Sequence, residues 1–263
     1  MSTGIIYIAT GKKYIDEACQ SAASLKAHMP TASVTLFADQ PIDSSYFDDV
    51  VVIENPEYGF IDKIMYMNKS PYDRTIFIDT DTRICDDISD LFVLLDRFDI
   101  AVSHEAQRGE RLIEGVPECF PELNTGVVPF RKTPQVEAFF LDWLAAYKQG
   151  MQSKQSLYQQ YNDQPSFQEV LYHSDLRVAT LTPEYNCRCL SSTFVSRKVK
   201  ILHLRHPDLS KVEQEINRNQ FKRIFYDPEI GLLRISQFER KLIIWMKRLK
   251  RGAMRLSNSE YEW

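Results

Sequence analysis

Short apolar runs alternate with amphipathic segments from the start of the chain. Such runs, rich in β-branched residues, are typical of buried strands. Four of them precede residue 80: Gly4–Ala9, Val34–Ala38, Val50–Ile53 and Thr75–Ile78. Between them, Tyr14–His28 and Phe60–Asn68 carry apolar residues at helical spacing. This alternation predicts an α/β fold with a mostly parallel sheet flanked by helices.

The same kinds of segment continue through the second half of the chain. Further strands are predicted at Ile100–Ser103, Val127–Phe130, Val178–Leu181 and Val199–Leu202, and further helices at Pro134–Lys148 and Pro165–Tyr172. Residues 105–121 and 149–160 are polar and are interpreted as connections. From Asp208 onwards the pattern is helical. We therefore expect one domain over residues 1–207 and a helical, basic extension over residues 208–263.

Polar residues follow the ends of the early strands. In a parallel sheet with helices on both faces, ligands bind beyond the carboxyl ends of the strands. The candidates at this edge are Thr10, Gly11, Asp39, Asp79 and Asp81.

The acidic pair after the fourth strand is the most informative of these. In extended chain, residues two positions apart point to the same side, so Asp79 and Asp81 face one space. Two carboxylates this close repel each other unless a cation joins them. A hard divalent cation such as Mg²⁺ or Mn²⁺ binds carboxylate and phosphate oxygens together. The pair therefore indicates a metal site that serves a phosphorylated ligand.

Other interpretations of the pair remain open at this point. Aspartate is common in turns and at helix N-termini, so the pair could have a purely structural role. A HAD-like phosphotransferase also carries Asp-x-Asp after a strand, but Thr or Val is wanted two places later, where Arg83 stands. A sugar-nucleotide pyrophosphorylase would need a glycine-rich basic loop after the first strand, and only Gly11 and two lysines are present. A non-catalytic nucleotide-sugar binder also fits the pattern.

Several segments, taken in chain order, resemble a known family of enzymes. The segments are Ile6–Gly11, the turn at Ser70–Arg74, Phe77–Thr82, Leu123–Val127, the pair Asp163 and Gln164, and Ile201–His203. They resemble the GT-A glycosyltransferases, close to family 8, the group of glycogenin and bacterial galactosyltransferases. The resemblance runs from about residue 4 to residue 207 and implies the GT-A fold.

The resemblance implies a role for each matched residue. Asp79, Asp81 and His203 would bind Mn²⁺ or Mg²⁺ on the donor diphosphate, with His206 as a substitute ligand or a phosphate contact. Thr10, Gly11 and Tyr14 would contact the base and ribose, together with Asp39, and Lys63 would face the donor. The donor sugar would meet Asn124, Thr125 and Gly126, while Asp163 and Gln164 would lie near its reacting carbon.

A retaining sugar transfer from a nucleoside-diphosphate sugar follows from the same resemblance. The expected donor nucleotide is UDP, and the expected acceptor is a hydroxyl group of a glycan or glycolipid. One difference from the family follows His203, where its members carry Gly and Lys-Pro-Trp. Here the sequence reads Leu-Arg-His-Pro-Asp, and Arg205 and His206 are candidates for the lysine's contact with phosphate.

Charge and composition narrow the partners and the compartment. The net charge of −4 gives no field that favours nucleic acid. The first residues lack the pattern of a signal peptide, and no run approaches the ~20 apolar residues of a membrane span. Five scattered cysteines are expected to be reduced thiols. Together these features predict a cytoplasmic protein.

The basic residues concentrate near the end of the chain. Residues 235–255 place Phe238, Leu242, Trp245, Met246 and Leu249 at helical spacing, with lysines and arginines between them. Such a helix can lie on an anionic membrane, which would put the protein on the inner face of that membrane. It can equally pack on its own domain with a solvated basic face.

Overall fold

The computed structural model describes residues 1–105, 113–152, 162–189, 193–218, 224–227, 231–233 and 245. Its centre is an eight-stranded sheet in the order β3-β2-β1-β4-β8-β6-β7, with β9 paired to β6. The strands are β1 (Thr3–Ala9), β2 (Val34–Ala38), β3 (Asp49–Val52), β4 (Arg74–Ile78), β6 (Ile100–His104), β7 (Leu123–Asn124), β8 (Val127–Arg131) and β9 (Val178–Leu181).

The sheet is mixed but mostly parallel. β1 pairs in parallel with β2 and β4, β2 with β3, and β6 with β9. β8 is antiparallel to both β4 and β6, and β7 is antiparallel to β6. The predicted α/β sheet is confirmed, and β7 and β8 are the strands that run against the rest.

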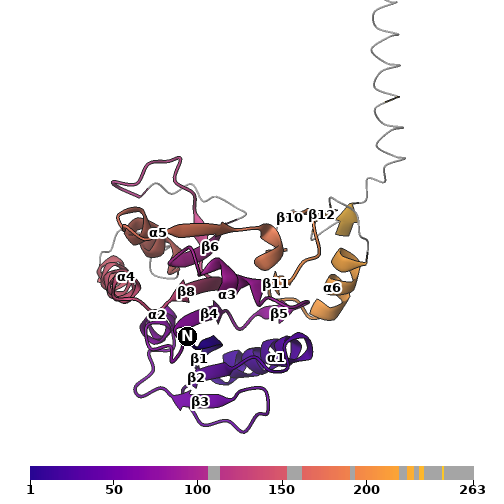
Figure 1. The fold of residues 1–263 in the computed structure, drawn as a ribbon, viewed down its shortest axis with the longest axis horizontal. Coiled ribbons are helices and arrows are strands. Elements are labelled where there is room, and N and C mark those ends of the chain that lie inside the picture. The colour runs from indigo at the N-terminus through magenta and orange to yellow at the C-terminus, as the bar shows by residue number, and fades with distance from the viewer. Residues whose placement is uncertain are drawn as a thin grey trace, which may run out of the picture.

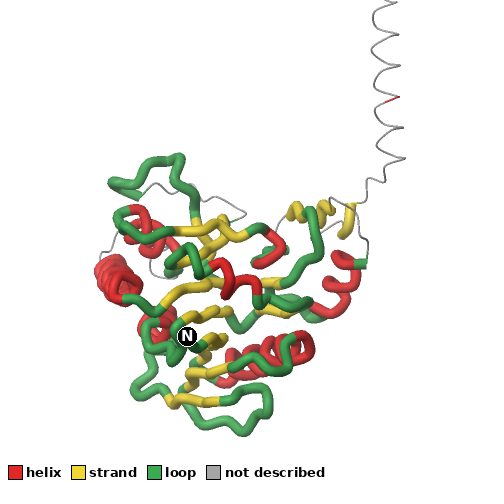
Figure 2. The backbone as a smooth tube through the Cα atoms, viewed as in Figure 1, coloured by secondary structure: helices red, strands yellow, loops and turns green. Residues whose placement is uncertain are grey.

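Helices cover both faces of this sheet (Figures 1 and 2). α1 (Lys12–His28) and α3 (Asp90–Leu94) pack on one face, while α2 (Phe60–Met67), α4 (Pro134–Gln152) and α5 (Gln164–Tyr172) pack on the other. Neighbouring strand residues alternate between the two cores, as Ile5 and Ile6 do. Apolar side chains on both faces explain why these strands are continuous hydrophobic runs.

A smaller layer stands beside the carboxyl end of β4. β5 (Thr82–Ile84) pairs antiparallel with β11 (Ile201–His203). β10 (Thr193–Val195), β12 (Ile224–Asp227) and β13 (Gly231–Leu233) form a three-stranded sheet. η1 (Pro183–Tyr185) precedes β10 in the chain, and α6 (Leu209–Asn217) follows β11. The layer has an apolar core of its own, which includes Cys85, Cys187 and Cys189.

Three predicted segments need correction: the helices after Asp208, the strand at Val199–Leu202 and the connection over residues 149–160. The helical interpretation from Asp208 onwards holds for α6 but is wrong for β12 and β13, where short aromatic and apolar runs favour strands. Because β12 pairs with β10, a sheet joins the two sides of the expected boundary at residue 207. The strand expected at Val199–Leu202 begins instead at Ile201, and α4 extends into the polar connection as far as Gln152.

The basic segment 235–255 lies outside the described residues except for Trp245, whose side chain is exposed. Among the residues that the structure describes, no helix combines the length and the apolarity needed to cross a membrane. The division at residue 207, the cytoplasmic location and the membrane contact stay predictions.

Candidate metal and donor site

The acidic pair lies where β4 ends and β5 begins. The Asp79 N–H donates to the Gly126 carbonyl at 2.8 Å, and the Thr82 hydroxyl donates to the Asp79 carbonyl at 2.8 Å. β5 then pairs with β11 in a register that sets Thr82 opposite His203. The chain thus brings a late histidine to two early aspartates through a short strand pair.

Asp79, Asp81 and His203 form a group that can hold a metal ion. Their ligand atoms all lie within 4.8 Å of one another. The Nε2 atom of His203 is 3.6 Å from Asp79 Oδ2 and 3.4 Å from Asp81 Oδ1. The His203 side chain is 6% exposed, whereas the side chains of Asp79 and Asp81 are 27% and 18% exposed. The imidazole therefore forms the buried wall of a group whose carboxylates still reach solvent.

Gly126 provides the room for this histidine. A Cβ added to Gly126 would overlap the Cε1, Nδ1 and Nε2 atoms of His203. The imidazole therefore lies directly on the backbone between β7 and β8, and only glycine permits this approach. Gly126, predicted to contact the donor sugar, lies against the candidate metal ligand.

The two carboxylates differ in their electrostatic surroundings. Burial raises the pKa of Asp79, against the opposing effect of Lys63 and His203. Burial also acts to raise the pKa of Asp81, but the hydrogen bond and charge of His203, together with Arg205, outweigh it and lower this pKa. A divalent cation favours the charged form of both carboxyl groups. The two carboxylates and one imidazole of this group are ligands that suit Mn²⁺ or Mg²⁺.

Lys63 is the internal counter-ion of the site. Its Nζ atom lies 3.3 Å from Asp79 Oδ1, 3.1 Å from Asp163 Oδ2 and 3.0 Å from Thr125 Oγ1. Burial acts to lower the pKa of Lys63, yet the charges of Asp163 and Asp79 outweigh it and raise the pKa. The ammonium group is therefore charged and holds the Asp79 carboxylate close to Asp163 and Thr125.

Asp163 is the second carboxylate that Lys63 binds. Its carboxylate accepts from the Thr125 hydroxyl at 2.9 Å, and the residue is only 2% exposed. Its carbonyl accepts from Trp143 Nε1 at 3.2 Å, which fixes the start of α5. Gln164 follows as the first residue of α5 and is half-buried. Asp163 is thus part of the site, bound to Lys63 and Thr125, and Gln164 is the next residue along the chain.

The loop after β1 is held by side chains from two other elements. The Thr10 hydroxyl donates to Asp62 Oδ2 at 3.0 Å, and the Gly11 N–H donates to Asp39 Oδ1 at 2.9 Å. Gly11 has a φ of 92°, which favours glycine. Thr10 and Asp39, predicted as nucleotide contacts, thus also shape the loop. Tyr14, on the first turn of α1, remains 40% exposed and available to a ligand.

Arg205 connects this loop with the acidic pair. Its guanidinium lies 5.6 Å from the ring centroid of Tyr14, and its Nη2 atom is 3.9 Å from Asp81 Oδ2. Glu17 of α1 supports it, because Glu17 accepts from Arg205 Nε at 3.3 Å and from the Thr80 hydroxyl at 3.1 Å. No sequence motif singles out Glu17, which is one of several polar residues of α1.

His206 and Asn124 both have partners within the protein. His206 is exposed, and its Nδ1 atom accepts from the N–H of Asp208, the N-cap residue of α6, at 3.0 Å; it is not one of the residues of the metal group. Asn124 is fully buried and its amide bonds to Gly126, Glu105 and Asn186. Asn186, which the sequence reasoning missed, lies 2.8 Å from the Nδ1 atom of His203.

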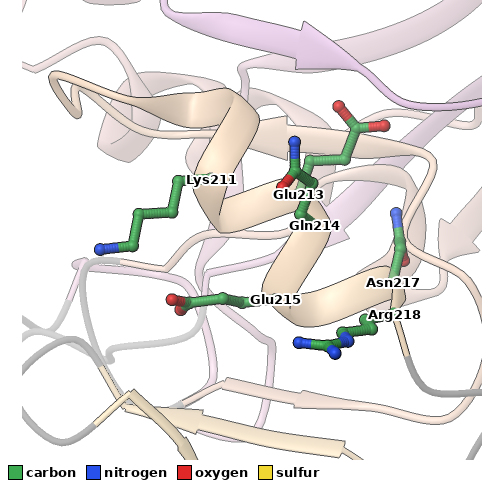
Figure 3. A pocket seen from close by; sticks show the side chains of 6 residues that line it. All are labelled: Lys211, Glu213, Gln214, Glu215, Asn217 and Arg218. Carbon is green, nitrogen blue, oxygen red and sulfur yellow. The ribbon is translucent and has the colours of Figure 1, made fainter.

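A hollow elsewhere on the molecule runs along α6 and is separate from this site (Figure 3). Two of its lining residues have structural partners: Glu213 binds Arg83 at 2.6 Å, and Asn217 accepts from the Val199 N–H at 2.8 Å. These contacts join α6 to β5 and to the segment before β11.

Comparison with known proteins identifies the fold. No protein-family model matches the chain, and no curated protein matches its sequence. Solved structures of glycosyltransferases do match. The apo form of the glycosyltransferase GlyE of Streptococcus pneumoniae TIGR4 has a TM-score of 0.57 at 15% identity, over 79% of this chain and 55% of that one. The galactosyltransferase LgtC, in complex with donor and acceptor sugar analogues, has a TM-score of 0.51 at 15% identity, over 78% and 87%.

The chain therefore has the GT-A glycosyltransferase fold that the resemblance implied. It spans just over half the length of GlyE and most of the length of LgtC. Within this fold, the candidate metal group Asp79, Asp81 and His203 lies at the carboxyl end of β4.

Proposed function

We propose that this protein is a metal-dependent glycosyltransferase. It moves a sugar from a nucleoside-diphosphate sugar, with UDP as the nucleotide, to a hydroxyl group of a glycan or glycolipid. The observation that carries this proposal is the cluster of Asp79, Asp81 and His203 at the carboxyl edge of a GT-A sheet. Two carboxylates and one imidazole leave positions for phosphate oxygens in an Mn²⁺ or Mg²⁺ shell.

The bound cation would supply Lewis-acid stabilisation to the leaving nucleoside diphosphate. The protein supplies the rest. Arg205, at the rim of the acidic pair, is positioned to contact a phosphate or the nucleoside beside Tyr14. Lys63 keeps Asp79 in place, while the carboxylates of Asp79 and Asp81 both retain access to solvent. The nucleotide would therefore lie between the loop after β1 and the end of β4.

The partners of the Asp163 carboxylate favour a transfer that retains the anomeric configuration. An inverting transfer needs a carboxylate free to take the acceptor's proton. The Asp163 carboxylate already accepts from Thr125 and pairs with Lys63, so it is suited to holding the donor side of the site. Asn124, with its amide satisfied by buried partners, supports the site from behind. Gln164, half-buried beside Asp163, remains the proposed contact for the donor sugar.

The first experiment measures thermal stability with UDP, GDP, CDP and ADP, each with and without Mn²⁺. A ligand at 100 times its Kd stabilises the folded state by about 2.7 kcal/mol, so a shift in Tm identifies the donor class. We expect a metal-dependent shift with UDP that disappears in Asp81→Asn. The matched control is Asp142→Asn, an exposed aspartate on α4, which should keep the shift.

Turnover then separates a transferase from a nucleotide-sugar binder. Incubation with UDP-sugars and Mn²⁺ should release UDP, slowly to water and faster with a hydroxyl acceptor. Absence of any Mn²⁺-dependent nucleotide shift would overturn the proposed donor site. A shift without nucleotide release from any donor and acceptor pair would leave only the binding function.

A further inference from the structure

The imidazole of His203 is held from behind by a chain of buried amides. His203 Nδ1 lies 2.8 Å from Asn186 Oδ1, and Asn186 Nδ2 lies 2.8 Å from Asn124 Oδ1. His203, Asn186 and Asn124 are 4%, 5% and 0% exposed. None of these contacts uses the Nε2 atom, which faces Asp79 and Asp81.

The orientation of the Asn124 amide is fixed at both of its atoms. The Gly126 N–H can only donate, and it lies 3.0 Å from Asn124 Oδ1. The Glu105 carboxylate accepts from Asn124 Nδ2 at 2.7 Å, and Arg188 pairs with the same carboxylate at 3.3 Å. A rotated amide would set two donors against each other at Gly126 and two acceptors at Glu105, which is costly in a buried place.

This orientation passes to Asn186 and then to His203. Since Asn124 presents its oxygen, Asn186 must present its N–H₂ group to Asn124 and its oxygen to the imidazole. An amide oxygen can only accept, so His203 Nδ1 must carry a proton. In the neutral imidazole the lone pair is then on Nε2, the nitrogen that faces the two carboxylates; only the protonated ring, in which both nitrogens carry hydrogen, also donates from Nε2 to Asp81.

The backbone explains why Asn186 is in this place. Cys187, the next residue, forms a bridge with Leu202 of β11, and its carbonyl accepts from the His203 N–H at 3.0 Å. The pairing aligns the 186–187 segment with β11, so Asn186 lies beside the ring of His203. Without Asn186 the ring would gain by moving its proton to Nε2 and donating to Asp79 or Asp81, which would hide the lone pair from a metal.

We infer that Asn186 is the positioning residue of the metal site: its oxygen fixes His203 as the Nδ1–H tautomer, and Asn124 and Glu105 fix Asn186. The inference rests on the proposed function in taking His203 as a metal ligand, and it reassigns Asn124 from a sugar contact to a support. Such partners orient a histidine ligand and set its tautomer, and their loss typically weakens metal binding by about 10- to 100-fold.

The test begins with the tautomer, which needs neither metal nor nucleotide. Two-bond ¹H–¹⁵N spectra of the metal-free, ¹⁵N-histidine-labelled protein, recorded at a pH at which the His203 ring is neutral, report which ring nitrogen of each histidine carries the proton. The His203 signals are assigned by their loss in His203→Asn. We expect Nδ1–H in the wild type and in Asn186→Asp, which retains an acceptor, and a shift toward Nε2–H in Asn186→Ala.

Mn²⁺ affinity, followed by the EPR signal of the free ion, is the second readout. Asn186→Ala should weaken Mn²⁺ binding by roughly 10- to 100-fold. The matched control is Asn217→Ala, which removes another amide from the same layer, the one that accepts from the Val199 N–H, without touching His203. It should lower Tm while keeping both the tautomer and the Mn²⁺ affinity.

Either readout can overturn the inference. Nε2–H in the wild type, or an unchanged tautomer in Asn186→Ala, would refute it. An Asn186→Ala affinity within about threefold of wild type would refute the link to the metal. Failure of the wild type to bind Mn²⁺ at all would instead defeat the proposed function, while the tautomer spectra would still decide whether Asn186 sets the proton on His203.

Discussion

Gly126 and His203 are in direct contact, with the imidazole lying where any side chain at position 126 would have to be. The contact joins the turn between β7 and β8 to the end of β11. It follows that a single methyl group at position 126 should displace the candidate metal ligand.

Gly126→Ala should therefore weaken Mn²⁺ binding strongly and destabilise the fold by about 1–3 kcal/mol, the usual range for overpacking a buried site. Equilibrium unfolding in urea and Mn²⁺ titration measure the two effects. A double-mutant cycle with His203→Ala provides the control. In that background Gly126→Ala should lose most of its cost, and a full cost there would show that the clash lies elsewhere.

Lys63 balances the buried charge of Asp163 and part of the charge of Asp79. Lys63→Met should destabilise the protein by about 3–5 kcal/mol, because it leaves carboxylates without their counter-ion. The double variant Lys63→Met with Asp163→Asn should recover part of this loss. Chemical denaturation at pH 7 measures both. An equal loss in the single and double variants would contradict the assigned pairing.

Glu184 links η1 to the segment that enters β11. Burial acts to raise the pKa of Glu184, but hydrogen bonds from the backbone N–H groups of Ser196 and Arg197 outweigh it and lower the pKa. A carboxyl group with a lowered folded-state pKa stabilises the fold above its unfolded pKa of about 4.3. This stabilisation is lost as the pH falls through the lower folded-state value.

Glu184→Gln should thus cost about 1 kcal/mol near neutral pH and progressively less below about pH 4. Thermal unfolding of both proteins between those limits measures the difference. A cost independent of pH would mean that the amide disturbs packing and that the charge contributes nothing.

Arg205 reaches both Tyr14 and Asp81, so its loss should affect the nucleotide more than the metal. Arg205→Gln should weaken UDP binding in the presence of Mn²⁺ by about tenfold, the equivalent of 1.4 kcal/mol. Isothermal titration with UDP and with uridine separates a phosphate contact from stacking on the base. Equal loss for both ligands would assign Arg205 to the nucleoside, and no loss for either would remove it from the site.

The basic segment 235–255 offers a test of membrane contact that depends on sequence alone. If it binds an anionic surface, the full chain should sediment with vesicles that contain phosphatidylserine, and less so at high salt. Replacing Lys247, Arg248, Lys250 and Arg251 by glutamate should abolish this binding. Equal sedimentation with neutral vesicles would contradict the electrostatic interpretation.

The early strands and helices could be predicted because their hydrophobic pattern is local. Val34–Ala38 and Val178–Leu181 begin and end where the pattern indicates. The acidic pair and His203 were accessible through their motifs. Asn186 and Glu17 were not, because their roles depend on contacts with residues far away in the sequence. The pairing of β5 with β11 could not be predicted either, because a strand of three residues is too short to show a hydrophobic periodicity.

The short β5–β11 pair has a consequence for stability. Its two strands belong to segments more than a hundred positions apart along the chain, and only three residue pairs join them. A cation held by Asp81 and His203 would therefore act as a cross-link across that long loop. Removal of the ion should loosen the layer of β10, β11 and α6 before the central sheet, so that this layer exchanges its amide hydrogens first.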